Sequence, residues 1–281
     1  MQFFDAHNHL HDPWLEPHLD DLAAQLPALG LRRAVANGTC EDDWPAVSDL
    51  SLRLPWVVPS FGLHPWHAGN RSPHWLDRLR AALAAHPAAH VGEVGLDRWM
   101  LDRARPDDPR LAGLRRSPPD EQREILAAQL ALAAGHGRAA TIHCLDAWGA
   151  LVDLLEGTPV PARGFLLHAY AGPVEMVPRF VRLGAYFSFN TAFIHDPRKR
   201  HAATFAAVPA ERLLAETDAP AMPPPSSSRP HQLPPAPSGE TINHPANIVA
   251  AYTVLATIRG LPVERLADQL ALNFQKLFGP A

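Results

Sequence analysis

Cysteine and lysine are both nearly absent from this chain of 281 residues, and each scarcity is informative. The two cysteines, Cys40 and Cys144, lie far apart and form no CxxC pair, which argues against a disulfide framework and fits a reducing compartment. Lysine occurs only at Lys199 and Lys276, so arginine supplies nearly all of the 25 basic residues. The net charge of −4 excludes the strongly basic character of a protein whose main task is to grip nucleic acid.

Long apolar runs are also missing. No stretch approaches the roughly 20 uncharged apolar residues that a membrane-spanning helix needs. The first residues, MQFFDAHNHL, contain neither a basic segment nor a small-residue cleavage motif, so they do not resemble a signal peptide. We therefore expect a cytoplasmic protein that does not associate with membranes, and no sequence feature indicates an obligate protein partner.

Short apolar runs alternate with longer amphipathic stretches along the whole sequence. Eight strand-then-helix pairs imply a parallel sheet, and the number eight favours closure into a barrel. We predict an α/β fold, namely a (β/α)8 TIM barrel that forms a single domain over residues 1–281, with an additional C-terminal helix. The predicted strands are Phe3–Ala6, Ala34–Asn37, Trp56–Phe61, His90–Val94, Ala139–His143, Phe165–His168, Ala185–Phe189 and Leu213–Glu216.

The helical stretches follow the same alternation. The least regular is Glu41–Leu54, because Pro45 and Ser48 interrupt its pattern. The segment Ala219–Pro237 is rich in proline and serine, and we expect it to be a long loop over the C-terminal face of the barrel. The other predicted helices are Leu15–Leu29, Trp75–Ala85, Glu121–Gly135, Ala147–Leu155, Val174–Leu183, Lys199–Ala207, Pro245–Arg259 and Val263–Phe278.

Polar residues gather where the predicted strands end, which is where barrels of this kind carry their chemistry. His7 and His9 follow the first strand, and residues two apart on a strand point the same way, so this pair can hold one ion. His64 follows the third strand, and we predict that it contacts substrate. Further candidate metal ligands end the fourth, fifth, sixth and eighth strands: Glu93, His143, His168 and Asp218.

These residue types constrain the metal. Imidazole together with carboxylate suits zinc, manganese, iron, nickel or cobalt better than the all-oxygen shell of magnesium or calcium. Six ligands exceed what a single tetrahedral ion needs, whereas two ions that share one carboxylate would use them all. Such a binuclear centre orients a bridging water, lowers its pKa and stabilises charge on the substrate oxygen.

Several blocks of sequence match one known family. They are DAHNHL (5–10), GLHPWH (62–67), VGEVGLD (91–97), IHCLDA (142–147), LLHAYAG (166–172), ETDAP (216–220), NHP (243–245) and NFQKLF (273–278). In their order and spacing the chain resembles the TatD-like metal-dependent hydrolases, a branch of the amidohydrolase superfamily, over nearly its whole length. Relatives in the wider superfamily use a carboxylated lysine at the end of the fourth strand, where this chain has Glu93 and no lysine.

The resemblance implies roles for individual residues. His7, His9, Glu93 and Asp218 would hold one divalent ion, and Glu93 would bridge to a second ion held by His143 and His168. Asp218 would also take the proton from the attacking water, which makes Asp218 and Glu93 the implied catalytic residues. The implied activity is a deoxyribonuclease acting on DNA ends or single strands, with magnesium, manganese or zinc as the metal.

The chain also departs from the family pattern at positions that border the pocket. Arg98 stands where the family often has an aromatic residue, and Leu145 stands where it has an arginine. The family's Arg-Asn-Glu-Pro becomes Ile-Asn-His-Pro at residues 242–245. An arginine-rich segment, residues 98–119, is either a phosphate-binding flap or a solvated loop whose carboxylates offset its charge.

Three functions are therefore open. The leading hypothesis is a TatD-type deoxyribonuclease or phosphodiesterase whose substrate is DNA. The alternative is hydrolysis of a small amide, ester or lactone by the same attacking water, and it gains from the missing arginines. A non-catalytic metal-binding protein is the third hypothesis, and the intact set of six ligands argues against it.

Overall fold

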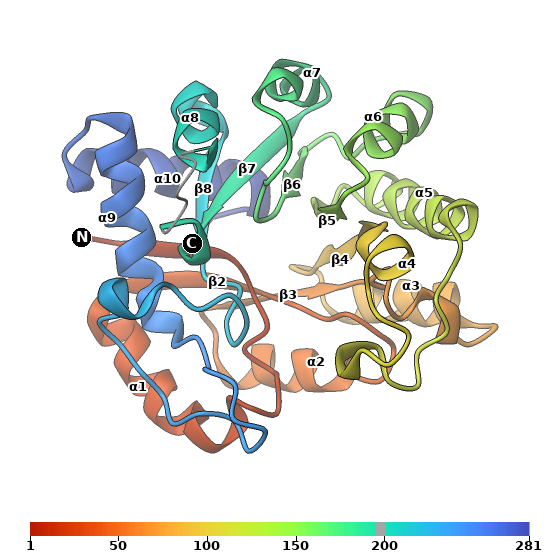
Figure 1. Cartoon of the computed structure of the whole chain (residues 1–281), viewed down its shortest axis with the longest axis horizontal. Coiled ribbons are helices and arrows are strands. Elements are labelled where there is room, and N and C mark those ends of the chain that lie inside the picture. Colours follow the sequence, from red (N-terminus) through yellow and green to blue (C-terminus); the bar gives the residue numbers. More distant parts are fainter. Residues whose placement is uncertain (195–199, 281) are drawn as a thin grey trace.

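A computed structural model describes residues 1–194 and 200–280 of the chain. Eight strands form one parallel sheet in sequence order, with helices between them on the outside (Figure 1). The predicted (β/α)8 barrel is therefore confirmed. The strands are β1 Phe3–Asn8, β2 Leu31–Asn37, β3 Val57–Phe61, β4 His90–Asp97, β5 Ala140–Leu145, β6 Phe165–Leu167, β7 Ala185–Asn190 and β8 Leu213–Glu216.

The main helices lie close to their predicted positions. Pro45 does not interrupt the second helix, because it falls in the first turn, where its missing N–H removes no hydrogen bond. Lys199, in the predicted helix Lys199–Ala207, lies outside the described residues. The helices are α1 Leu19–Leu29, α2 Trp44–Arg53, α3 Trp75–Ala85, α4 Trp99–Asp102, α5 Pro119–Gly135, α6 Trp148–Gly157, α7 Val177–Arg182, α8 Arg200–Ala207, α9 Ile248–Arg259 and α10 Val263–Phe278.

The barrel closes between its first and last strands. The backbone N–H of Asp218 donates to the carbonyl of His7 over 3.0 Å, and the N–H of His9 donates to the carbonyl of Ala219 over 2.7 Å. These bonds join the carboxyl ends of β1 and β8. They therefore bring the histidine pair of the first strand next to the acidic residue that follows the last strand.

One end of the barrel interior is filled by apolar side chains. Phe4, Val35 and Leu214 point inward from the strands and pack with Phe274 and Phe278 of α10. The additional C-terminal helix thus seals the amino-terminal end of the barrel, and the opposite end is left for polar side chains.

The strands β1 and β4 run further than their apolar patterns predict. β1 continues to Asn8, which pairs with Ala36 of β2 after an irregular step, and β4 continues to Asp97, which pairs with Leu145 of β5. The apolar pattern of β1 stops before the site residue His7, although the strand continues through it. The sequence therefore predicts the core of each strand better than its functional end.

The proline-rich segment after β8 leaves the barrel at its carboxyl end. Ala221 and Met222 line a cavity there, and His231 and Leu233 lie further on, against α1. Asn243 fixes the return of this segment, since its side-chain amide donates to the carbonyl of Thr217 over 2.8 Å. In Figure 1 the light-blue segment runs beside α1 before the chain enters α9.

Among the described helices, none is by itself long and apolar enough to cross a membrane. Pro245–Arg259 and Val263–Phe278 satisfy the length and composition criteria only as a pair, bent by 106°.

Candidate metal centre

The structure brings all seven predicted site residues together at the carboxyl end of the barrel. His7 lies at the end of β1, Glu93 in β4 and His143 in β5. The other four lie one to three residues beyond the ends of strands β1, β3, β6 and β8. Together they form the floor of a cavity of about 700 Å³, with His7 completely buried beneath it. The four residues that follow strands are His9, His64, His168 and Asp218.

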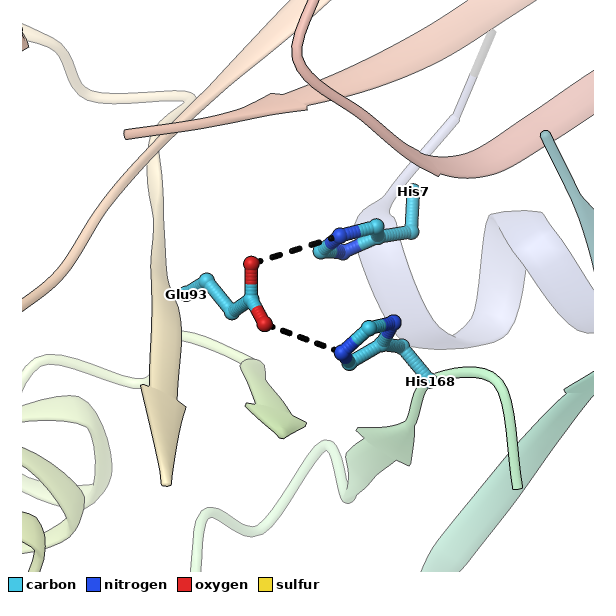
Figure 2. A group of neighbouring side chains, drawn as sticks. All are labelled: His7, Glu93 and His168. Atoms are coloured by element: carbon cyan, nitrogen blue, oxygen red, sulfur yellow. Dashed lines mark ion pairs between the residues drawn. The ribbon is translucent and has the colours of Figure 1, made fainter. Parts of the chain in front are cut away.

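Glu93 lies at the centre of this group, and its two carboxylate oxygens face different histidines. Oε2 lies 3.5 Å from Nε2 of His7 and 3.3 Å from Nε2 of His9. Oε1 lies 3.2 Å from Nδ1 of His143 and 2.9 Å from Nε2 of His168. Figure 2 shows the carboxylate between the rings of His7 and His168, with one oxygen directed at each ring.

Asp218 belongs to one side of this arrangement. Its Oδ1 lies 3.2 Å from Nε2 of His7 and 3.3 Å from Nε2 of His9. The residues thus divide into two half-sites that share Glu93. The first contains His7, His9 and Asp218, and the second contains His143 and His168.

Hydrogen-bond acceptors behind two of the rings, and a carboxylate near a third, determine which nitrogen can bind a metal. A neutral imidazole carries one proton, and an acceptor behind the ring holds that proton away from the centre. The inward-facing nitrogen is then a lone-pair donor. The three contacts are His9 Nδ1 to the carbonyl of Asn37 at 2.7 Å, His143 Nε2 to Asp97 Oδ2 at 3.2 Å and His168 Nδ1 to Glu216 Oε1 at 3.5 Å.

Behind the ring of His64 lies a hydrogen-bond donor instead of an acceptor. Its Nδ1 accepts a hydrogen bond from the backbone N–H of Trp66 over 3.2 Å, so in the neutral ring the proton sits on Nε2. Nε2 lies 3.4 Å from Oε1 of Glu93. Burial lowers the pKa of His64 to about 4, which keeps the ring neutral near pH 7. His64 lies within ligand distance of Glu93 and His143, but this tautomer makes it a hydrogen-bond donor.

The remaining rings fit a bound cation. His7 is fully buried, yet neither of its nitrogens makes a hydrogen bond within the described part of the chain. Nδ1 of His143 and Nε2 of His168 face each other at 3.3 Å. Two lone pairs repel at that separation unless a cation lies between them. A tetrahedral ion with bonds of about 2.0–2.1 Å places its ligand nitrogens roughly 3.3 Å apart.

The histidines around Glu93 and Asp218 stabilise the ionised form of both carboxylates. Burial alone would raise the pKa of Glu93, but the charges of His168, His64 and His7 outweigh it and hold the pKa well below its usual range. Burial would likewise raise the pKa of Asp218, but the rings of His7 and His9, at 3.2 and 3.3 Å from its Oδ1, outweigh burial and lower that pKa. Both carboxylates are therefore ionised at neutral pH, as metal ligands must be.

The cavity above these residues has two unlike walls. Histidine and acidic side chains from the loops after β1 and β2 form one wall, including His11, Asp12 and Asp42. Leu145, Phe193 and Met222, with several alanines, form the other. Among the described residues that line the cavity there is neither arginine nor lysine.

The arginine-rich segment does not supply the missing positive charge. Arg103 pairs with Asp146 at 3.3 Å, and Arg115 pairs with Glu121 at 2.6 Å. Arg110 pairs with Asp108 at 2.8 Å and lies over the ring of Trp99. These contacts favour a solvated loop with balanced charge over a phosphate-binding flap.

Two acidic residues beyond the seven predicted ones, Asp97 and Glu216, also support the centre. Both are fully buried, and each lies behind a histidine that another strand contributes. Glu216 is itself held by Ser188 and by Asn190, whose side-chain amide donates to Oε1 over 3.0 Å. The one available signal was that each acidic residue ends a strand next to a predicted ligand.

A cluster of histidines and carboxylates at the carboxyl end of a closed (β/α)8 barrel defines the class of barrel-fold metal-dependent hydrolases. Comparison with known families is more specific. The TatD related DNase model matches residues 4–279, and the chain belongs to this family of metal-dependent hydrolases.

Individual relatives are modestly similar over nearly their full length. The chain is 27% identical over 262 residues to the 3'-5' ssDNA/RNA exonuclease TatD of Klebsiella pneumoniae, covering 92% of this chain and 91% of the relative. It is 24% identical over 275 residues to YabD of Bacillus subtilis, an uncharacterized metal-dependent hydrolase, covering 98% of each. A human deoxyribonuclease is 26% identical, with 98% and 93% covered.

Solved structures agree with the fold. The TatD homologue YJJV of Escherichia coli K12 superposes with a TM-score of 0.83 at 24% identity, over 99% of this chain and 98% of that one. A TatD family hydrolase of Entamoeba histolytica gives a TM-score of 0.81 at 16% identity, with 99% of both chains covered.

Proposed function

We propose that this chain is a two-metal hydrolase that cleaves phosphodiester bonds at DNA ends or in single strands. The position of Glu93 carries the proposal, because each of its oxygens faces a separate set of histidines. The names of relatives, a single-strand exonuclease and a deoxyribonuclease, support DNA as the substrate.

The residues have distinct tasks in this proposal. His7, His9 and Asp218 would hold one divalent ion, His143 and His168 the other, and Glu93 would bridge them. The metal would be zinc, manganese, magnesium, nickel or iron. Such ions lower the pKa of water and offset the negative charge that develops on the substrate's oxygens.

Asp218 would act as the base. It is ionised at neutral pH and lies at the cavity floor, so it can accept a proton from the water that attacks phosphorus. His64 presents a neutral Nε2–H to the same space, and it would donate a hydrogen bond to a substrate oxygen. Asp218 and Glu93 are thus the proposed catalytic residues, and His64 binds substrate.

A second function is favoured by the cavity walls. The described lining has no arginine or lysine to hold a phosphate backbone, and one wall is apolar. Such a cavity suits a small amide, ester or lactone, which the same water would attack at its carbonyl carbon.

One screen tests both functions. Metal-stripped protein is reloaded with zinc, manganese or magnesium and assayed against single-stranded DNA, a simple phosphodiester, and panels of lactones and amides. We expect phosphodiester turnover that Glu93→Gln abolishes, and that His74→Gln, a change at an exposed position in the loop before α3, leaves intact. Carbonyl turnover without any phosphodiester turnover would overturn the nuclease proposal.

The metal assignment has its own measurement. Elemental analysis should find two divalent ions per chain, and Glu93→Ala or His9→Ala should lose metal. Full metal content together with full activity in either variant would contradict the assignment.

A further inference from the structure

Asp97 is the last residue of β4, and its side chain is fully buried beside the metal centre. Its Oδ2 accepts a hydrogen bond from the indole Nε1–H of Trp66 over 2.7 Å and lies 3.2 Å from Nε2 of His143. Its Oδ1 accepts from the backbone N–H of Met100 over 2.9 Å. Both carboxylate oxygens are therefore engaged, and the indole N–H of Trp66 and a ring nitrogen of His143 converge on one of them.

The backbone of Asp97 is fixed as well. Its N–H donates to Oε1 of Gln122 over 2.8 Å, and Nε2 of Gln122 donates to its carbonyl over 3.1 Å. Gln122 belongs to α5 and is itself buried. The carboxylate is consequently held from the sheet on one side and from a packed helix on the other.

This placement matters because His143 differs from the other inward-facing rings. His7, His9 and His168 direct Nε2 towards the centre, whereas His143 directs Nδ1. For Nδ1 to offer a lone pair, the proton must stay on Nε2. An ionised carboxylate that only accepts, placed behind Nε2, has this effect.

We propose that Asp97 is a positioning residue that holds His143 with its proton on Nε2 and so directs Nδ1 to the metal. The inference rests on the proposed two-metal function. Trp66 is the second member of the unit, since its indole N–H fixes the same oxygen. Its backbone N–H donates to Nδ1 of His64, so that ring also carries its proton on Nε2, but His64 turns Nε2 towards the centre where His143 turns Nδ1. Asp97 and Trp66 together make His143 a metal ligand and His64 a hydrogen-bond donor.

Asparagine at position 97 is the sharpest test. Its amide has nearly the same shape, but it offers one acceptor where the carboxylate offers two. The amide oxygen can replace only one of the two carboxylate oxygens. Where it keeps the bond from the backbone N–H of Met100, the amide N–H groups stand in the place of Oδ2, face Nε2 of His143 and favour a proton on Nδ1. We expect Asp97→Asn to bind zinc about 10–100-fold more weakly. The thermal unfolding of the metal-free variant should stay close to wild type.

A second measurement does not depend on affinity or activity. In zinc-loaded, ¹⁵N-labelled wild type, NMR correlations of the imidazole ring of His143, assigned by their loss in His143→Gln, should show a protonated Nε2. The Asp97→Asn variant should lose this signal. A zinc-loaded wild type whose Nε2 is unprotonated would overturn the inference, even if no Asp97 variant folds.

Two further variants show whether Asp97 sets the tautomer of His143 or only stabilises the fold around it. Trp66→Phe removes the indole donor and keeps the carboxylate, so the Nε2–H signal of His143 should remain and zinc affinity should fall less than in Asp97→Asn. Asp97→Glu keeps an acceptor and should restore the signal that Asp97→Asn loses. If Asp97→Asn binds zinc as wild type does, Asp97 has no such role. If wild type binds no zinc at all, the proposed function fails instead.

Discussion

At the scale of single residues, His64 and His143 illustrate how similar positions acquire different chemistry. Both rings face Oε1 of Glu93, at 3.4 and 3.2 Å. A backbone N–H lies behind His64, whereas a carboxylate lies behind His143. The group behind each ring, more than the distance in front of it, decides whether that ring donates a proton or a lone pair.

His64→Ala tests this distinction. We expect kcat/KM for the hydrolysed substrate to fall about 100-fold, because one preorganised hydrogen-bond donor is lost. The metal content should stay at the wild-type value, since the tautomer of His64 leaves no lone pair for an ion. Steady-state kinetics and elemental analysis of the same preparation check both. Loss of metal in His64→Ala, with His74→Ala unaffected, would show that His64 is a ligand.

At the scale of secondary-structure elements, strand β4 carries both the site and the contacts that position it. Glu93 is its fourth residue, and Asp97, its last, pairs with Leu145 of β5. Gly95 lies between them, where a Cβ atom would come within 2.0 Å of the carbonyl oxygen of His143. The close approach of β4 to β5, and hence of Glu93 to His143, depends on a residue without a side chain.

Gly95→Ala should therefore be costly. We expect the free energy of unfolding to fall by about 2–3 kcal/mol, because the added methyl group meets backbone that cannot move alone. Urea denaturation measures the change. Gly149→Ala in α6 is the matched control, since nothing lies near its added methyl group, and alanine there should stabilise the helix by about 0.5–1 kcal/mol.

The start of β4 is tied to α10 by His90. Its Nε2 donates to the carbonyl of Phe278 over 2.9 Å, and its Nδ1 accepts from the backbone N–H of Ala139 over 3.1 Å. Burial lowers the pKa of His90 from 6.5 to about 4. The folded protein therefore holds this ring neutral at pH values where the unfolded chain protonates it.

This shift predicts a pH dependence of stability. Between pH 6.5 and pH 4 the unfolded state binds more protons at His90 than the folded state does, so stability falls as the pH is lowered. Over the whole interval, the shift in the pKa of His90 changes the free energy of unfolding by about 3 kcal/mol. His90→Gln should be less stable than wild type at pH 7.5, and the difference should shrink at pH 4.5. An equal difference at both pH values, measured by chemical denaturation, would contradict the prediction.

At the scale of the whole molecule, the two ends of the barrel have opposite characters. α10 fills the amino-terminal end with aromatic and aliphatic side chains, while the carboxyl end concentrates histidines and carboxylates. Without a cation, buried lone pairs and charges at that end face each other and oppose folding. The apolar end therefore supports the fold, and the polar end depends on its ligand.

Removal of the metal should consequently lower the melting temperature. Ions bound to the folded state alone, at 100 times their dissociation constant, stabilise it by about 2.7 kcal/mol. For a protein of this size we expect a loss of about 5 °C or more on chelation, recovered when zinc is added back. Differential scanning calorimetry measures the shift. Glu93→Gln should respond to neither treatment, and a similar response in that variant would place the stabilising ions elsewhere.

Much of this protein could be predicted from its sequence. The alternation of apolar and amphipathic stretches predicted the barrel, since each element shows its own period along the chain. His7 and His9 were visible as a pair, because two residues on one strand point the same way. The order of the blocks from DAHNHL to ETDAP indicated the family that the comparisons then showed.

Only the tertiary structure decided which ring nitrogens can bind a metal and which donate a hydrogen bond. Asp97 and His143 lie 46 residues apart, yet they meet because neighbouring parallel strands end at the same height. The contact between Glu216 and His168 and the unlike walls of the cavity likewise join different strands and loops. Spacing along one strand can predict a candidate ligand, but its tautomer depends on a hydrogen bond from elsewhere in the barrel.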